Sequence, residues 1–357
     1  MQGYMNWYEI KNSAEVDSPS LILFEERLQS NIQQMIAEVN GDTNRLMPHV
    51  KTNKCQKVIE AMVQQGITRF KAATIVETEL AAKAGAKTVL LAHQPVGPKI
   101  EKLSKLILQY PQTQFSTLVD NSKTAQLLHQ TNPRPSVYID VNNGMNRSGI
   151  KPGKGLTNLI EFIQNETDLE LKGLHVYDGH LHQSDLEIRK NEAQKGLEKV
   201  EDFFGDFEII AGGTPTFSVH KNNKRLICSP GTSVFHDWGY GEMLKEQNFE
   251  PAVLLLTRVI SKPTEGIVTI DLGHKAVAAE NPIDRRFKIL NLEHYELLSQ
   301  SEEHGVLKVN NWDEIEVGDM FFAIPYHICP TVNLHHQFGV IRQNSLTEYW
   351  PTMAATR

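Results

Sequence analysis

A lysine that leaves a short apolar run is the first candidate for chemistry in this sequence. In "RLMPHVKTNK" the run ends at Lys51, and a second lysine, Lys54, follows three residues later. Lysine is among the residues least often buried, so the plain interpretation of Lys51 is a solvated loop residue. A partly desolvated amine near cationic neighbours has instead a lowered pKa and is a usable nucleophile.

His327 and Cys329 are a second candidate site, in "IPYHICPTVNLH" near the C-terminus. The two residues are two positions apart, so in an extended segment both side chains point the same way. Imidazole and thiolate together suit a borderline-soft divalent ion such as Zn²⁺, and Mn²⁺ fits when further oxygen ligands join. The alternative is a buried cysteine beside a solvated histidine.

Two apolar runs lead into polar clusters. In "DVNNGMNRSGI", Arg147 could point back toward the strand and bind an anionic oxygen. In "VYDGHLHQ", the side chains of Tyr177, Asp178, His180 and His182 come within six residues. Such a group of titratable side chains at a strand exit indicates acid–base chemistry.

Two stretches of small residues could bind a phosphate. "AGGTPTF" contains Gly212, Gly213 and Thr214, and its glycines and threonines expose backbone N–H groups and hydroxyls. "SPGTSVF", residues 229–235, could supply the other side of such a cup. Each stretch alone also fits an ordinary glycine-rich turn.

The elements that must position these residues alternate between short apolar runs and longer helical stretches. Helical periodicity with a terminal glycine predicts helices over 56–66 and 75–85, and Asn121 is a plausible N-cap of a third. Strand starts recur roughly every 20 to 35 residues, the spacing of parallel βαβ units. The predicted strands are 21–24, 45–50, 69–73, 88–92, 114–119, 136–141, 171–177, 208–213 and 225–231.

Eight such units predict a closed (β/α)8 barrel over residues 20–240, and a doubly wound open sheet is the alternative. After Trp238 the sequence changes to strand-like pieces joined by Gly, Pro and Asn turns. We expect a mostly antiparallel β domain there, made of residues 241–357 and joined by residues 1–19. In a barrel the active site lies at the carboxyl ends of the strands, which is where Lys51 would emerge.

Composition narrows the functional classes. The 357 residues carry a formal charge of −7 without a basic cluster, which argues against nucleic acid as a partner. Apolar runs such as "AVLLL" are too short to span a membrane, and the N-terminus lacks an apolar signal core. Three cysteines far apart fit a reducing, cytoplasmic environment better than a disulfide scaffold.

Seven motifs in register give the chain a family resemblance. "PHVKTNK", "DVNNGMNRSGI", "VYDGHLHQ", "GGTPTF", "SPGTSVFHDWGY", "EEHG" and "IPYHICPTVN" occur in this order. Together they resemble the D-threonine aldolase / D-serine dehydratase family, whose members have the alanine-racemase-like fold and depend on pyridoxal 5'-phosphate (PLP). The resemblance covers nearly the whole chain.

The resemblance implies roles for most of the candidate residues. Lys51 would form the Schiff base with PLP, Arg147 would contact the phenolic oxygen of the cofactor, and Tyr177 would lie near its pyridine ring. His327 and Cys329 would bind a divalent metal, Zn²⁺ or Mn²⁺. The phosphate would be held by Gly212, Gly213, Thr214, Gly231 and Thr232.

Similar enzymes act on small D-amino acids with a β-hydroxyl, and a homodimer is expected from the family. A metal makes sense where that hydroxyl must be activated. In an aldolase, His180 or His182 could act as the base on the hydroxyl. In a dehydratase, Lys51 would remove the α-proton.

The motifs divide between two reactions. "YDGH" and "CPTVNL" resemble the aldolase branch, whereas the His-x-Cys pair of His327 and Cys329 resembles the dehydratase branch. We expect an aldolase giving glycine and an aldehyde, with a dehydratase giving a 2-oxo acid and ammonia as the alternative. An amino-acid racemase and a non-enzymatic PLP carrier remain as further interpretations.

Overall fold

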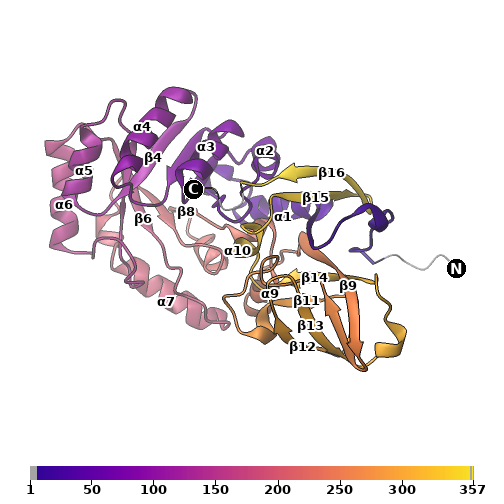
Figure 1. The fold of residues 1–357 in the computed structure, drawn as a ribbon. Helices are drawn as coiled ribbons and strands as arrows, with labels where there is room; N and C mark the ends of the chain where they lie inside the picture. Colours follow the sequence, from indigo (N-terminus) through magenta and orange to yellow (C-terminus); the bar gives the residue numbers. More distant parts are fainter. Residues whose placement is uncertain (1–5, 354–355, 357) are drawn as a thin grey trace.

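The protein is described here by a computed structural model, which covers residues 6–353 and 356, and the chain forms two sheets (Figure 1). In the first sheet, seven strands pair in parallel and in chain order, with helices on the outside. This order never reverses, unlike that of a doubly wound sheet. The strands are β2 (Arg69–Ala72), β3 (Thr88–Leu91), β4 (Gln114–Val119), β5 (Ser136–Asp140), β6 (Leu171–Val176), β7 (Glu208–Ala211) and β8 (Leu226–Cys228).

The helices of this part follow the strands, as the sequence predicts. Asn121 caps α5 as expected, because its side chain accepts a hydrogen bond of 2.8 Å from the backbone N–H of Thr124. The helices are α1 (Glu25–Glu38), α2 (Gln56–Gln64), α3 (Ile75–Lys83), α4 (Pro98–Gln109), α5 (Ser122–His129), α6 (Lys154–Glu166), α7 (Leu186–Glu198) and α8 (Phe217–His220).

The "LMPHV" run joins the two edges of this curled sheet. The backbone N–H of Met47 donates to the carbonyl of Cys228 on β8 (2.9 Å), and that of Val50 donates to the carbonyl of Lys71 on β2 (2.8 Å). Pro48 has no N–H to donate, so the run pairs through isolated bridges rather than as a regular strand. It occupies the eighth position of the barrel.

The barrel interior has an apolar floor and a polar layer above it. Alternation along β5 directs Tyr138 and then Asp140 inward, and the second lies nearer the carboxyl end. Lys71 and His175 lie in the same polar layer, where both are buried. The apolar floor consists of Met47, Leu90, Leu118, Tyr138, Ile210 and Ile227.

The second sheet is mostly antiparallel, as expected, and lies beside the barrel (Figure 1). Its order is β12-β13-β10-β9-β1-β15-β16, and β14 pairs with both β9 and β11. Its strands are β1 (Ser20–Phe24), β9 (Val253–Thr264), β10 (Ile267–Ile270), β11 (Phe287–Ile289), β12 (Tyr295–Gln300), β13 (Gly305–Val309), β14 (Met320–Pro325), β15 (Gln337–Arg342) and β16 (Ser345–Pro351).

The assignment of 21–24 to the barrel is wrong. These residues form β1, in which Leu21 pairs in parallel with Phe338 and antiparallel with Leu255. Side chains on both faces of β1 are buried, so its sequence is as continuously apolar as that of a barrel strand. Apart from this strand, the division into residues 20–240 and residues 1–19 with 241–357 stays a prediction, and residues 1–5, 354–355 and 357 lie outside the described ranges.

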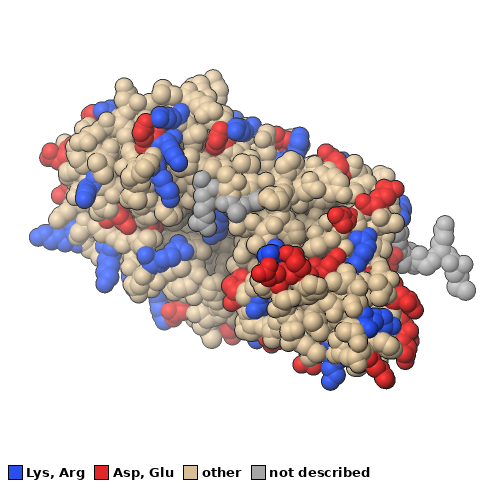
Figure 2. All heavy atoms as spheres, in the orientation of Figure 1, with Lys and Arg blue, Asp and Glu red and all other residues tan. Residues whose placement is uncertain are grey.

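Short helical segments connect these elements. They are α9 (Trp238–Met243), α10 (Ile328–Val332) and the 3₁₀ turns η1 (Ser13–Glu15), η2 (Thr43–Arg45), η3 (Glu201–Phe203), η4 (Thr232–Val234), η5 (Ile283–Arg285) and η6 (Trp312–Glu314). Among the residues described, no helix has both the length and the apolar character needed to cross a membrane. On the face shown in Figure 2, basic side chains are interspersed with acidic ones.

Candidate functional site

Lys51 lies at the carboxyl end of the barrel, as the sequence predicts for the amine of a barrel site. It occupies a turn directly after the run that joins β8 to β2, and its side chain is exposed. The next residue, Thr52, has its hydroxyl 3.2 Å from the sulfur of Cys329. This contact brings the predicted amine and the predicted metal pair, which are far apart in sequence, into one place.

Lys54, the second lysine of the motif, is buried, and its side chain holds the turn that contains Lys51 against neighbouring elements. Its ammonium donates to the side-chain oxygen of Asn333 (2.6 Å) and lies 3.6 Å from a carboxylate oxygen of Glu77. Asn333 follows directly after α10, which carries Cys329. Lys54 therefore connects the Lys51 turn to the helix that carries Cys329.

The His327–Cys329 pair lies at the start of α10 rather than in an extended segment. His327 has extended backbone angles at the N-cap, whereas Cys329 is inside the helix. The sulfur lies between two hydroxyls, that of Thr52 at 3.2 Å and that of Thr232 at 3.5 Å. No group of three or more His, Cys, Asp or Glu residues with metal-binding geometry occurs in the described ranges.

The electrostatics of the pair favour a thiolate beside an imidazolium. Burial lowers the pKa of His327, but the hydrogen bond and the charge of Cys329 outweigh it and raise that pKa to about 9. Burial raises the pKa of the Cys329 thiol, but hydrogen bonds from His327, Thr232 and Thr52 outweigh it, so the pKa is lower than usual. The other ring nitrogen of His327, Nδ1, lies 2.7 Å from Glu280 Oε1.

Tyr177 and Arg147 lie close together at the barrel mouth. The guanidinium carbon of Arg147 lies 4.9 Å from the centre of the Tyr177 ring. Two glycines leave room for the ring, because a Cβ at Gly179 would lie 2.2 Å from its atoms and one at Gly213 would lie 3.1 Å away. The ring is thus fixed between backbone segments.

His180 and His182 are exposed, and the neighbouring Asp178 is not part of the same cluster. His180 reaches toward the loop after β5, where its Nε2 would be 3.5 Å from a Cβ placed on Gly144. Asp178 is buried in the barrel wall instead. The sequence motif therefore separates into exposed imidazoles at the mouth and one internal carboxylate.

The glycine loop after β7 is held by this carboxylate. Asp178 accepts a hydrogen bond from Thr216 Oγ1 (2.7 Å) and lies 2.6 Å from His220 Nε2. Gly212 has a φ of +67°, and a Cβ there would lie 2.4 Å from Thr216 Oγ1, so the loop requires glycine at this position.

The two stretches of small residues meet, as a cup requires. The hydroxyl of Thr214 accepts hydrogen bonds of 3.0 Å from the backbone N–H groups of Gly231 and Thr232. A Cβ at Gly231 would lie 3.1 Å from the Thr52 hydroxyl, so only a small residue fits beside the Lys51 turn. The predicted phosphate residues Gly212, Gly213, Thr214, Gly231 and Thr232 are therefore neighbours.

A buried chain of polar groups below the mouth was missed by the sequence analysis. His175 Nδ1 lies 2.8 Å from Asp140 Oδ1, and His175 Nε2 lies 3.5 Å from the Lys71 ammonium. Hydrogen bonds from Gln94 and Ser148 also reach Asp140, each at 2.8 Å. The sequence contained a signal for this chain. Side chains alternate between the two faces of a strand, so within the predicted strands 69–73, 136–141 and 171–177 the residues Lys71, Asp140 and His175 fall on the face that points into the barrel.

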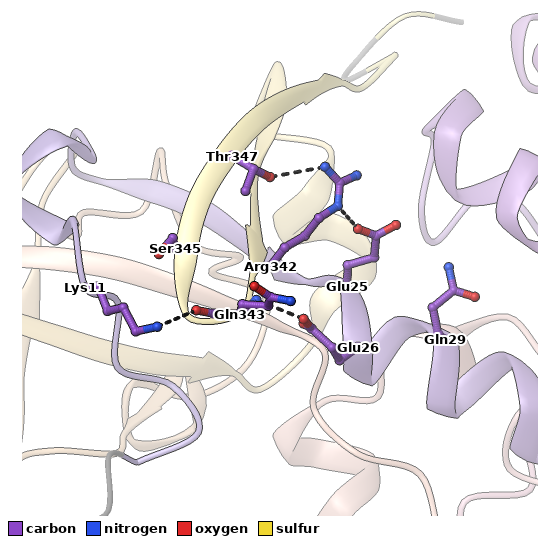
Figure 3. Close-up of a pocket in the computed structure, with 8 residues that line it drawn as sticks. All are labelled: Lys11, Glu25, Glu26, Gln29, Arg342, Gln343, Ser345 and Thr347. Carbon is purple, nitrogen blue, oxygen red and sulfur yellow. Dashed lines mark hydrogen bonds and ion pairs between the residues drawn. The ribbon is translucent and has the colours of Figure 1, made fainter. Parts of the chain in front are cut away.

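The hollow drawn in Figure 3 is separate from these groups. It lies between α1 and the β15–β16 hairpin, and Arg342 pairs there with Glu25. Gln343 accepts a hydrogen bond from Lys11 and donates one to Glu26. None of the predicted site residues lines it.

Comparisons with known proteins agree with this geometry. The family model "Alanine racemase, N-terminal domain" matches residues 25–233, and a serine dehydratase domain model matches residues 252–341. The chain is 24% identical over 389 residues to 3-hydroxy-D-aspartate aldolase of Paracoccus denitrificans, with 99% of this chain and 97% of that protein covered.

Two solved structures extend the comparison. D-threonine aldolase from Filomicrobium marinum superposes with a TM-score of 0.86 at 26% identity, covering 96% of each chain. D-threo-3-hydroxyaspartate dehydratase from Delftia sp. HT23 has a TM-score of 0.80 at 19% identity, covering 95% of this chain and 98% of that one. The expected fold class and family resemblance are confirmed.

Proposed function

This chain belongs to the alanine racemase N-terminal domain family, and on that premise we propose that it is a PLP-dependent lyase acting on D-β-hydroxy amino acids. The expected reaction is a retro-aldol cleavage that gives glycine and an aldehyde. The contact of Thr52 with Cys329 carries the proposal, because it holds the residue next to Lys51 against the predicted metal pair. Two aldolases for such substrates, 3-hydroxy-D-aspartate aldolase and D-threonine aldolase, align in sequence over 99% and 96% of this chain.

The residues at the barrel mouth fit PLP. Lys51 would hold the cofactor through its amine, Arg147 would face the phenolic oxygen, and Tyr177 would lie at the ring. The phosphate would be held by the cup of Gly212, Gly213, Thr214, Gly231 and Thr232, where a Cβ does not fit at Gly212 and would be tightly packed at Gly231. When bound, PLP supplies an electron sink for negative charge that develops on the substrate's α-carbon.

His327 and Cys329 fit two ligand positions of a divalent metal, Zn²⁺ or Mn²⁺. Glu280 Oε1 lies 2.7 Å from His327 Nδ1 and would accept the proton of that nitrogen, which would leave Nε2 as the metal ligand. The hydroxyls of Thr52 and Thr232 donate to the thiolate and hold it in place. A metal here would bind the β-hydroxyl of the substrate, and His180 or His182 would accept the hydroxyl proton.

The alternative function is a dehydratase that gives a 2-oxo acid and ammonia. Cys329 favours it, because the solved forms of the Delftia dehydratase include a cysteine-to-alanine variant described as metal-free. In that reaction Lys51 would take the proton from the α-carbon, and the metal would bind the departing hydroxyl. We also propose a cytoplasmic homodimer, which size-exclusion chromatography with light scattering would test.

A product assay tests the proposal. The purified protein is incubated with PLP, Zn²⁺ or Mn²⁺, and either D-threonine or 3-hydroxy-D-aspartate. Glycine with an aldehyde supports the aldolase, and a 2-oxo acid with ammonia supports the dehydratase. Racemised amino acid alone, or turnover that Cys329→Ala leaves unchanged, would contradict a metal-dependent lyase.

A further inference from the structure

Lys71 is an amine inside the barrel to which the proposed function assigns no role. Its side chain is on β2, one strand away from the run that ends in Lys51, and only 2% of the residue is exposed. Lys71 and His49 form the bridge that joins β2 to that run. Lys51 lies two residues after His49, in the turn that ends this run, and its charge acts on Lys71.

In the contacts that lead from Asp140 to Lys71, the donor and the acceptor of each hydrogen bond can be assigned. An ionised Asp140 can only accept, so the 2.8 Å contact puts the proton of His175 on Nδ1. His175 Nε2 is then an acceptor that faces the Lys71 ammonium at 3.5 Å. Lys71 Nζ also lies 5.3 Å from the centre of the Tyr177 ring, against which the cofactor would sit.

The charges that act on Lys71 come from several elements and are of both signs. The pKa of Lys71 is lowered to about 7, chiefly by burial and also by repulsion from Lys51 and Arg147. Attraction to Asp140 and Asp178 opposes this lowering. The histidines that face Lys71, His49 and His175, both have lowered pKa values, chiefly through burial, and so are neutral at pH 7.

We propose that Lys71 is a positioning residue for the cofactor. Lys71 contacts His175, which in turn contacts Asp140, and the charge of this chain lies below the bound PLP. This charge determines the protonation state in which PLP is bound. This inference rests on the proposed function. A buried ammonium in the polar layer stabilises an anionic oxygen on the molecule above it, and a neutral amine does not. The colour of PLP reports this difference without any turnover.

The experiment is a pH titration of the visible absorbance of the PLP-loaded protein without substrate. The wild-type band should change in one step with a midpoint within about one unit of pH 7. Lys71→Met should lose this step, and Lys71→Arg should keep the low-pH spectrum throughout, because arginine stays charged. Lys172→Met is the matched control, since Lys172 is at the amino end of β6, paired with Glu170 at 2.6 Å, and should titrate like the wild type.

The outcomes separate the two proposals. A wild-type protein with no borohydride-reducible PLP adduct contradicts the proposed function and this inference with it. A wild-type step that persists in Lys71→Met at the same midpoint overturns this inference alone. Should Lys71→Met fail to fold, Asp140→Asn should lower the midpoint, and an unchanged midpoint there would overturn the inference as well.

Discussion

Removing the carboxylate of Asp178 should destabilise the fold and loosen the glycine loop together. Asp178 is 2% exposed and is the acceptor for two side chains that are just as buried, His220 at 2% and Thr216 at 0%. In Asp178→Ala neither side chain can reach water. Both would then keep a donor without a partner inside the barrel wall.

The expected size follows from this count. A buried donor that loses its partner costs about 1–3 kcal/mol, so two such donors cost about 2–6 kcal/mol. We expect Asp178→Ala to lower the free energy of unfolding by about 4 kcal/mol, a large part of the roughly 5–15 kcal/mol typical of a domain. Asp178→Asn keeps the volume and one acceptor, so its loss should be about 1–3 kcal/mol.

Urea denaturation measures the stability, and absorbance titration with PLP measures the affinity. We expect PLP to bind Asp178→Ala at least about tenfold more weakly, equal to roughly 1.4 kcal/mol, because the loop at Gly212 loses its support. Asp168→Ala is the control, since the Asp168 side chain is 72% exposed and its ion pair with Arg134 spans 3.4 Å. Exposed pairs contribute about 0–1 kcal/mol. A loss in Asp178→Ala no larger than in the control would refute the reasoning.

Three other changes test separate parts of the site. Lys51→Ala should abolish the reducible PLP adduct and its colour with an unchanged unfolding midpoint; a yellow adduct that persists would count against Lys51. Glu280→Gln should weaken Zn²⁺ binding about 10- to 100-fold, because His327 loses the partner that orients it; chelator competition showing equal affinity would contradict this. The pKa of Lys71 is about 7 in the folded protein, against an ordinary value of 10.5. Between pH 7 and pH 10.5 the unfolded chain therefore binds more protons than the folded one, so the free energy of unfolding rises with pH in this range. Lys71→Met should flatten that rise in urea denaturation at several pH values, and equal slopes would argue against it.

The sequence predicts the barrel correctly because its signal is local. Each parallel strand is short and apolar, and each following helix has its own periodicity and caps, as at Asn121. Residues placed just after strands then meet at one end, since parallel strands share their carboxyl edge. The positions of Lys51, Arg147 and Tyr177 at the barrel mouth follow from this rule.

Partners across the fold could not be predicted in the same way. An apolar pattern shows that β1 is buried on both faces, but hydrogen bonds to Phe338 and Leu255 decide which sheet it joins. The direction of Asp178 likewise depends on His220, which is 42 residues away in sequence. Such contacts have no local signature, because any buried acceptor needs a donor and the sequence does not specify which one.

The sequence by itself determined the strand–helix rhythm, the residues at the strand exits and the family to which they belong. Only the tertiary structure shows that Thr52 contacts Cys329 and that Lys54 donates a hydrogen bond to Asn333 after α10. It also shows that His175 contacts both Lys71 and Asp140. The physical reason is that the burial of each element can be predicted from the local pattern of apolar and polar residues. Hydrogen-bond and charge partners are fixed only when distant segments pack together and exclude water.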